Sequence, residues 1–391
     1  MRFSFAAGLA LGALAAPLQA QQPLLASRAV AVTPAFESWS FGDGVTHGFG
    51  GARIERASQW SIPIAISVAT GTRWTIDLSS AYAQGTVTLD RADAQLGVSE
   101  LSLAGPADVR VRATGRFLGE RLLLTVGGVL PTGKTDLAGD ELSALRVLSA
   151  PALSFQTPVL GGGPGATVGL VLARPVGSWA LAAATSFEYR GSYTPAAIVA
   201  GMPTPDFSPG EVVHLSLGLD GLVGQHGATI LGSLDLFGRD RLGDDAAIAP
   251  TRLGPVATID ARLNLAASGF QQFTLYLVDR YRSSFSRDGA TVEESAGNYL
   301  DAGIQTVYAL SPRTGLLTAL NARHQSGLGF DTGIQTAAIA SGALTVGLTR
   351  QLGSGFELAP FVRAQLGRLE SGLESTNVRG LAGGVTLGRR F

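Results

Sequence analysis

The stretch from Gly128 to Thr135 has the spacing of a nucleotide-binding P-loop, with Lys134 and Thr135 at its end. In such a site Lys134 would lie beside the β- and γ-phosphates, and a helix would begin at once to present its N-terminus to them. The next residues are a poor helix opening because Gly139 lies in the first turns. We therefore interpret the stretch as the end of a strand followed by a turn.

The four histidines, His47, His214, His226 and His324, are the second candidates for chemistry. No two of them have the spacing of a metal-binding motif, and the sequence lacks the GxSxG turn of a serine hydrolase. A rim site assembled from distant strands, for example His324 with Ser326, stays open as an enzyme alternative. The sequence predicts no metal site and no cofactor.

Three arginines between Val109 and Phe117 are the third candidates. Arg110, Arg112 and Arg116 alternate with apolar residues, so a strand would collect them on one face and a helix would scatter them. Inside a pore such charges set the field and the ion preference. Alternatively, they only pair with carboxylates in a crowded interior. We predict that they line a lumen, and that the same holds for Asp260, Arg262, Arg280, Glu357 and Arg363.

The segments that would position these side chains are strands joined by connections that alternate between short and long. Tight turns are predicted at 71–72, 119–120, 176–178, 224–226, 268–269, 311–314 and 352–355. Longer connections are predicted at 42–57, 89–107, 131–164, 191–210, 239–251, 283–297, 327–339 and 369–376. Outer-membrane barrels have short periplasmic turns and long external loops, whereas a sandwich with Greek-key crossings does not require this alternation.

The sequence therefore predicts an all-β protein, a transmembrane antiparallel up-and-down β-barrel of about sixteen strands, with about fourteen as the fallback. The first strand is expected near 30–41, interrupted by Pro34, and the last near 377–391. Both termini then lie on the periplasmic side. The connections 131–164, 191–210 and 283–297 are expected on the outer surface.

Composition agrees with a barrel that lies in a membrane. The 391 residues are 46% hydrophobic and 15% charged, with a mean hydropathy of +0.25. Beyond the N-terminal segment, no uninterrupted apolar stretch reaches the roughly 18 residues of a membrane helix. The 52 glycines and the lack of cysteine suit closely packed strands and export. The net charge of −1 gives no nucleic-acid-binding footprint. We expect the bacterial outer membrane, with its lipid as a partner.

The two ends of the chain carry signals of export and assembly. Residues 1–20 read as a secretory signal peptide, with Arg2 before an apolar run and a cleavage region near Ala20. The barrel would then comprise residues 21–391. The final Phe391 shares a face with Leu381, Val385 and Leu387. This resembles the last strand of outer-membrane proteins, whose terminal aromatic is read by the outer-membrane assembly machinery, a predicted partner.

Three motifs between Gly105 and Arg190 carry a family resemblance. Asp108-Val109 opens the arginine-rich strand, and Leu130-Pro131-Thr132-Gly133-Lys134 ends the next. A glycine-rich loop at 161–165 then leads into a hairpin that closes with Phe187-Glu188-Tyr189-Arg190. This region resembles the outer-membrane transporter family named after the meta-pathway of phenol degradation. The resemblance implies a barrel that passes aromatic or other apolar compounds.

The predicted function is a channel or porin-like transporter for the passive passage of small-molecule solutes, without enzymatic activity. Two alternatives stay open: a barrel enzyme with a rim active site, and a structural or adhesive barrel with a plugged lumen. The sequence does not decide whether the lumen is open, because this depends on how connections such as 131–164 fold.

Overall fold

The computed structural model describes residues 28–47, 52–92, 97–157, 160–194, 205–243, 250–268, 271–292, 295–327, 337–371 and 374–390. The predicted signal peptide at 1–20 and the terminal Phe391 lie outside the described residues. Most of the described chain is β-strand, and no helix in it is long and apolar enough to cross a membrane.

One sheet contains most of the strands. Its members are β1 (Arg28–Val32), β2 (Ala35–His47), β3 (Ala52–Thr70), β4 (Trp74–Leu89), β5 (Glu100–Pro106), β6 (Val109–Phe117), β7 (Leu122–Leu130), β8 (Gly165–Val176), β9 (Trp179–Arg190), β11 (Val212–Val223), β12 (His226–Phe237), β15 (Val256–Ser268), β16 (Gln271–Arg282), β19 (Gly297–Ser311), β20 (Thr314–Ser326), β21 (Ala338–Gly353), β22 (Phe356–Ser371) and β23 (Glu374–Arg390). Two small sheets extend the longer connections: β10 (Phe207–Ser208) with β13 (Arg241–Leu242), and β14 (Thr251–Arg252) with β17 (Ser286–Arg287) and β18 (Ala290–Thr291).

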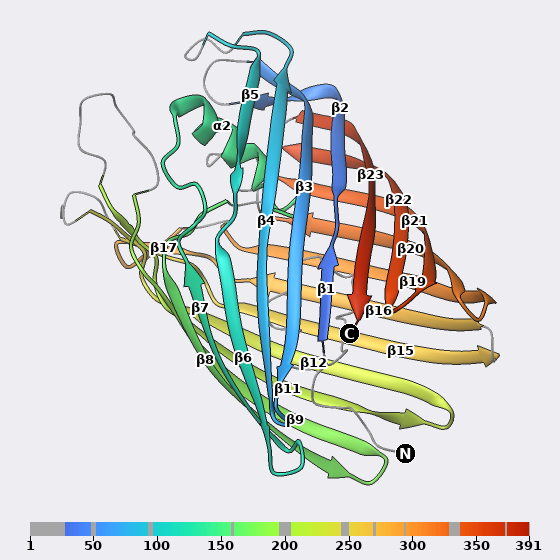
Figure 1. The fold of residues 1–391 in the computed structure, drawn as a ribbon. Coiled ribbons are helices and arrows are strands. Elements are labelled where there is room, and N and C mark those ends of the chain that lie inside the picture. The colour runs from blue at the N-terminus through green and yellow to red at the C-terminus, as the bar shows by residue number, and fades with distance from the viewer. Residues whose placement is uncertain are drawn as a thin grey trace.

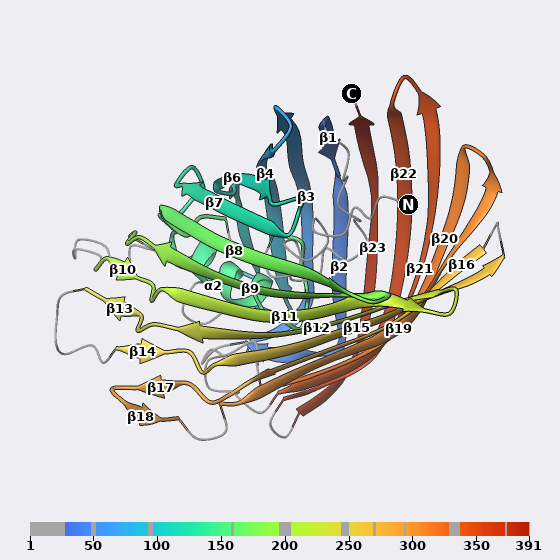
Figure 2. The same cartoon turned by 90° about the horizontal axis from the view of Figure 1, so that it is seen from below.

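The large sheet closes on itself because the first strand pairs with the last (Figures 1 and 2). β1 and β2 lie in line on either side of Pro34, and both pair with β3 and with β23. Proline cannot donate to a ladder, which is why the strand breaks there. β5 and β6 also lie in line, both beside β4. The described wall is therefore a closed antiparallel barrel of sixteen strands, and the predicted fold is confirmed.

The sixteen strands are of unequal length. β3 has 19 residues and β23 has 17, whereas β8, β9, β11 and β12 have 12 each. Strand structure therefore occupies most of the predicted connections 42–57 and 369–376, and β5 lies within 89–107. These three predictions were wrong because the inner faces of the extended strands bury apolar side chains such as Ile54, Leu101 and Leu369.

The connection 131–164, here named the lumen segment, contains the helix α2 (Gly139–Leu148). Its first turn carries Asp140 and Glu141 and its last turn carries Arg146, charges that suit the helix dipole. Ala144, Val147 and Leu148 form its buried stripe at helical spacing. The segment folds inward against the wall instead of standing free of it, and the side of the membrane on which this end of the barrel lies stays a prediction. The physical reason is this apolar stripe, which needs a wall to cover it.

Candidate pore and its lining

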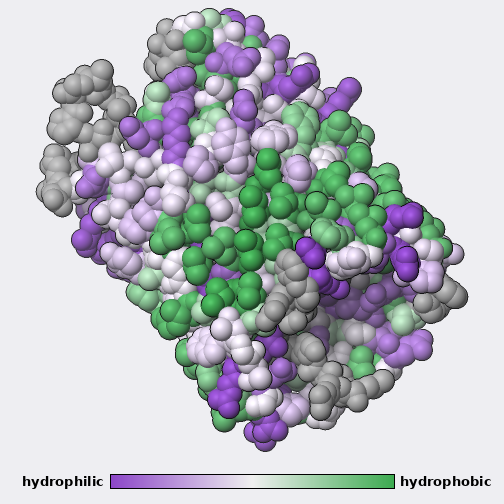
Figure 3. Space-filling view, viewed as in Figure 1, coloured by the Kyte–Doolittle hydropathy of each residue, from purple (hydrophilic) through white to green (hydrophobic). Residues whose placement is uncertain are grey.

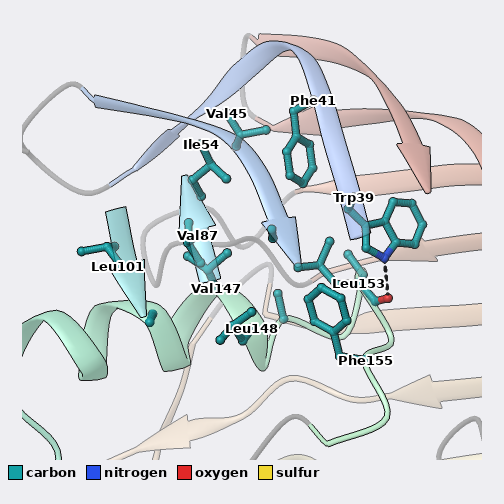
Figure 4. Packing of buried hydrophobic residues seen from close by; sticks show 14 of the residues in the cluster. Trp39, Phe41, Val45, Ile54, Val87, Leu101, Val147, Leu148, Leu153 and Phe155 are labelled. Atoms are coloured by element: carbon teal, nitrogen blue, oxygen red, sulfur yellow. Dashed lines mark hydrogen bonds between the residues drawn. The ribbon is translucent and has the colours of Figure 1, made fainter. Parts of the chain in front are cut away.

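The lumen segment covers one part of the inner wall (Figure 4). Its helix packs against the inner face of β4, where a Cβ at Gly85 would collide with the Leu148 side chain. Further on, the Trp39 indole N–H donates to the carbonyl of Leu153 at 2.9 Å. The buried cluster that results draws on the inner faces of β2, β3, β4, β5, β21, β22 and β23, which together we name the covered wall.

Beyond α2 the lumen segment reaches from β3 round to β20. The side-chain amide of Gln59 donates to the carbonyl of Thr157 at 2.8 Å and accepts from the Thr157 N–H at 3.1 Å. Arg323 of β20, only 4% exposed, donates to the carbonyl of Ala152 at 2.6 Å. Its guanidinium also lies 5.8 Å from the ring centroid of Trp39. A segment held by strands on two sides of the barrel lies inside it.

The two ends of the lumen segment meet at the break between β5 and β6. One Asp108 carboxylate oxygen accepts from the N–H of Gly133 at 2.8 Å, and the other accepts from the N–H of Gly162 at 2.7 Å. The Asp108 N–H donates to the carbonyl of Leu160 at 2.9 Å. We name this meeting point the neck. It brings together all three motifs that carry the family resemblance.

The inner face of β6, β9, β11, β12, β15, β16 and β19, here named the polar wall, differs in content. Arg262 bonds to Asp260 at 2.7 Å, and the Arg262 side chain is 45% exposed although it points inward. His214 lies between Asp235, 2.7 Å from its Nδ1, and Glu188, 3.8 Å from its Nε2. Charged side chains that face inward and remain accessible indicate water along this wall.

A second polar cluster surrounds Asp301 of β19, a carboxylate that is buried on the inner face. It accepts from the hydroxyl of Tyr276 at 3.2 Å, the hydroxyl of Tyr299 at 3.0 Å and the amide of Asn321 at 3.1 Å. Three donors therefore satisfy the hydrogen-bonding capacity of this buried carboxylate. The sequence analysis counted His214 among the histidines but did not place it or Asp301 in the lumen; each lies on an alternating inner face, which was the available signal.

The arginines of β6 lie on the inner face, because each lies opposite an inward residue of β7 while Val111 and Ala113 share the outer face with Val126. Arg112 bonds to Asp77 at 2.9 Å, and Arg116 bonds to Glu120 in the adjacent turn at 3.5 Å. For Arg110 the described part of the chain gives no ion pair. Two of the three are therefore engaged by carboxylates.

The other residues predicted to line the lumen also have inward positions in the register. Arg280 lies 5.2 Å from the ring centroid of Tyr299. Glu357 accepts from Gln351 and lies 3.6 Å from Arg390. The Nε of Arg363 is buried and has no hydrogen-bond partner among the described residues. Asp260 and Arg262 contact each other, but the eight residues do not form a single site.

The remaining candidates for chemistry have other surroundings. Lys134 bonds to Glu141, and α2 begins at Gly139, later than a P-loop requires. A helix does follow, contrary to the expectation from Gly139 alone. His324 lies on the outer face opposite Leu300 and is exposed. In the described ranges, no group of three or more histidine, cysteine or acidic side chains is arranged to hold a metal.

The outer face of the barrel is apolar over a broad band (Figure 3). Leu217 on β11 is 64% exposed, and Leu366 and Leu381 on the adjacent strands β22 and β23 are 66% and 56% exposed. Such a surface is unfavourable in water, whereas the core of a bilayer requires an apolar outer face. The bilayer core also requires a closed ladder of hydrogen bonds that leaves no backbone group unpaired. The chain is an outer-membrane β-barrel.

Comparisons with solved structures give distant likenesses. A bacterial polysaccharide outer membrane secretin shares 8% identity with a TM-score of 0.47, covering 93% of this chain and 98% of that one. OpdK of Pseudomonas aeruginosa with vanillate shares 11% identity, TM-score 0.46, covering 92% and 98%. An outer membrane channel from Pseudomonas putida F1 shares 12% identity, TM-score 0.39, covering 96% and 100%. No family model and no curated protein matches the sequence. With scores this low, the fold rests on the strand pairing of the chain itself.

Proposed function

We propose that the barrel is a channel for the passive passage of small solutes across the outer membrane. The observation that carries the proposal is the contrast within the interior: the lumen segment covers one wall, while the polar wall keeps accessible charges such as Arg262 and Asp260. A barrel serving only as a rigid plug would gain nothing from inward charges kept in contact with water. The arginines of β6 and the other predicted lining residues would then set the field in the pore.

Reconstitution of the purified barrel into planar bilayers tests this proposal. Stepwise conductance is the expected result. The lumen segment gives weight to one competing function, a structural or adhesive barrel whose interior is plugged. A correctly folded barrel that is electrically silent and passes no solute would favour that function. Silence accompanied by hydrolytic activity would favour a rim enzyme.

The proposed solutes are aromatic or other apolar compounds of small size. The support is the resemblance of 105–190 to the meta-pathway transporter family, whose three motifs converge at the neck. Liposome flux assays with an aromatic compound and a sugar of matched size test this choice. Faster entry of the aromatic compound is expected. Equal entry of both would leave a general pore without this preference.

The ends of the chain belong to the same proposal. Residues 1–20 would be removed on export, and Phe391 would be read by the assembly machinery. N-terminal sequencing of the barrel from outer membranes should begin near Gln21. Deletion of Phe391 should lower the yield of assembled barrel while leaving synthesis unchanged.

A further inference from the structure

The neck is the feature of the interior that the channel proposal leaves unexplained. Residues of the lumen segment that follow β7 and those that precede β8 return to the same place, the interruption between β5 and β6. Beyond the bonds to Asp108, the Val109 N–H donates to the hydroxyl of Thr132 at 3.0 Å, and the Lys134 N–H donates to the carbonyl of Pro106 at 3.2 Å. Both legs are thus fixed to one short stretch of wall.

The legs also pack closely on each other. A Cβ at Gly133 would collide with the backbone of Leu160 and Gly161, and a Cβ at Gly161 would collide with Thr135. Only glycine permits this crossing. Backbone groups so close to each other have little room for water, so their N–H groups need protein acceptors. The Asp108 carboxylate supplies two of them, one oxygen to each leg.

An ionised carboxylate that accepts from two backbone N–H groups makes stronger bonds than a neutral acceptor does. Asparagine at this position would keep the shape but offer one oxygen and one NH2 group, so one leg would face a donor instead of an acceptor. The neck therefore depends on the charge of Asp108 as well as its size. The Gly162 end is 54 residues along the chain from Asp108, so the bond also closes a long loop.

We propose that Asp108 is the positioning residue that turns the lumen segment into the barrel and thereby sets the bore of the pore. With both legs bound at the neck, the segment leaves the wall pointing inward, and α2 meets the apolar inner faces of β4 and β5. With the neck open, the same segment is free to leave the barrel as an external loop, the arrangement that the alternation of turn lengths alone predicts. The bonds of Asp108 at the neck thus determine that the lumen segment runs inward.

Labelling of a single cysteine tests the neck without reference to transport. The chain has no cysteine, and Ala144 of α2 is fully buried against the covered wall, so Ala144→Cys introduces one protected thiol. An impermeant maleimide should react slowly with this variant in reconstituted barrels. Combining it with Asp108→Asn or Asp108→Ala should raise the labelling rate by roughly tenfold or more, the factor for losing one charge-assisted hydrogen bond.

Asp90→Asn is the matched control. Asp90 also accepts from a backbone N–H, that of Arg53 at 2.8 Å, and it follows the end of β4, whereas the neck lies beside the middle of that strand. It should leave the labelling of Ala144→Cys unchanged. Retained migration as a folded barrel in cold detergent gels shows that each variant has assembled. The proposal is overturned if assembled Asp108→Asn and Asp108→Ala barrels are labelled at the wild-type rate. It is also overturned if only one of the two variants assembles and that variant is labelled at the wild-type rate.

A conductance measurement deepens the result and rests on the proposed channel function. Asp108→Asn should enlarge the unit conductance or make it fluctuate, and Asp90→Asn should not. If the wild-type barrel is silent while Asp108→Asn still exposes Ala144→Cys, the channel function fails and the role of Asp108 stands. If the wild type conducts and both readouts ignore Asp108, the channel stands and the role of Asp108 fails.

Discussion

The covered wall and the polar wall are built from strands of the same kind, yet their inward positions carry opposite chemistry. On the covered wall Val87 and Leu101 are fully buried beneath α2. On the polar wall the equivalent positions hold Asp260 and Arg262, which stay accessible. On the outer face, Leu217 and Ile259 of the polar wall are exposed, whereas Thr86 and Ser102, which point outward beside Val87 and Leu101, are polar. The difference teaches that the inner face of a barrel strand follows whatever lies across from it.

The largest expected effect is a difference in stability between substitutions on the covered wall and on the polar wall. Val87→Arg would bury a charge with no partner beneath α2 and should destabilise the barrel by roughly 3–5 kcal/mol. Ser233→Arg, on the polar wall between Ser216 and Thr258, should change stability by less than about 1 kcal/mol because water reaches it. Urea unfolding in detergent micelles measures both. Equal damage would show that the two walls are equally dry.

The next effect separates the outer face from the inner face of one strand. Val111→Arg places a charge among lipid-facing residues and should cost about 2–4 kcal/mol near mid-membrane. Thr114→Arg, whose hydroxyl lies 3.4 Å from that of Thr125 on the inner face, should be much milder. Reversible folding into bilayers of defined thickness gives the two free energies. A reversed order would mean that the face assignment of β6 is wrong.

A smaller effect depends on pH and concerns the start of α2. Burial raises the pKa of Glu141, but hydrogen bonds from Lys134 and the Ala138 N–H, with the charge of Lys134, outweigh it and hold the pKa below its ordinary value. A lowered carboxyl pKa stabilises the fold above the unfolded-state value of about 4.3, and this stabilisation is lost as the pH falls through the folded-state value. The expected loss is about 0–1 kcal/mol because the pair is partly exposed.

Comparison of the wild type with Glu141→Gln measures this loss. Stability of the wild type should decline more steeply than that of Glu141→Gln as the pH is lowered from about 6 to about 3. Asp140→Asn, one residue earlier in the same helix turn, serves as the control and should follow the wild type. Parallel curves for the wild type and Glu141→Gln would remove the Lys134 pair from the energetics of α2.

The smallest expected effect concerns ion preference and distinguishes a charge without an ion pair in the described ranges from a charge within one. Arg110→Gln removes an inward charge that has no ion pair in the described ranges, so the reversal potential under a salt gradient should shift towards cation preference. Arg112→Gln together with Asp77→Asn removes a whole pair and should leave the reversal potential nearly unchanged. If neither change moves the reversal potential, these residues are structural and do not set selectivity.

The alternation of residues along the strands was sufficient to predict the wall of the barrel. The two-residue period of the strands places Arg110 on the inner face. Glycine-rich sequence predicts the tight turns at 71–72, 119–120 and 352–355. Both signals are local in the chain. The inward course of the lumen segment did not follow from the sequence, for the opposite reason. The apolar stripe of α2 needs a surface to cover it, but that surface, for example the inner face at Gly85, comes from strands far away in the chain.

The neck was visible in the sequence only as three separate motifs. Asp108, Gly133 and Gly162 were each part of the family resemblance, but the bonds that join them span 25 and 54 residues. Spacing along the chain cannot show that two glycine legs cross at one carboxylate. The partners of His214 and Asp301 were likewise beyond local inference, because the members of each cluster come from three strands.

The closure of the barrel has a consequence for how the protein is made. The hydroxyls of Thr33 and Thr386 lie 3.1 Å apart at a separation of 353 residues, so the seam joins nearly the two ends of the described chain. Contacts between residues so far apart in the sequence form slowly, because a long loop must close before the contacts can stabilise the fold. Until the seam forms, two strand edges stay unpaired, and lipid does not tolerate them. A nascent chain therefore needs its edges held until β23 arrives, and the barrel is completed in one late step.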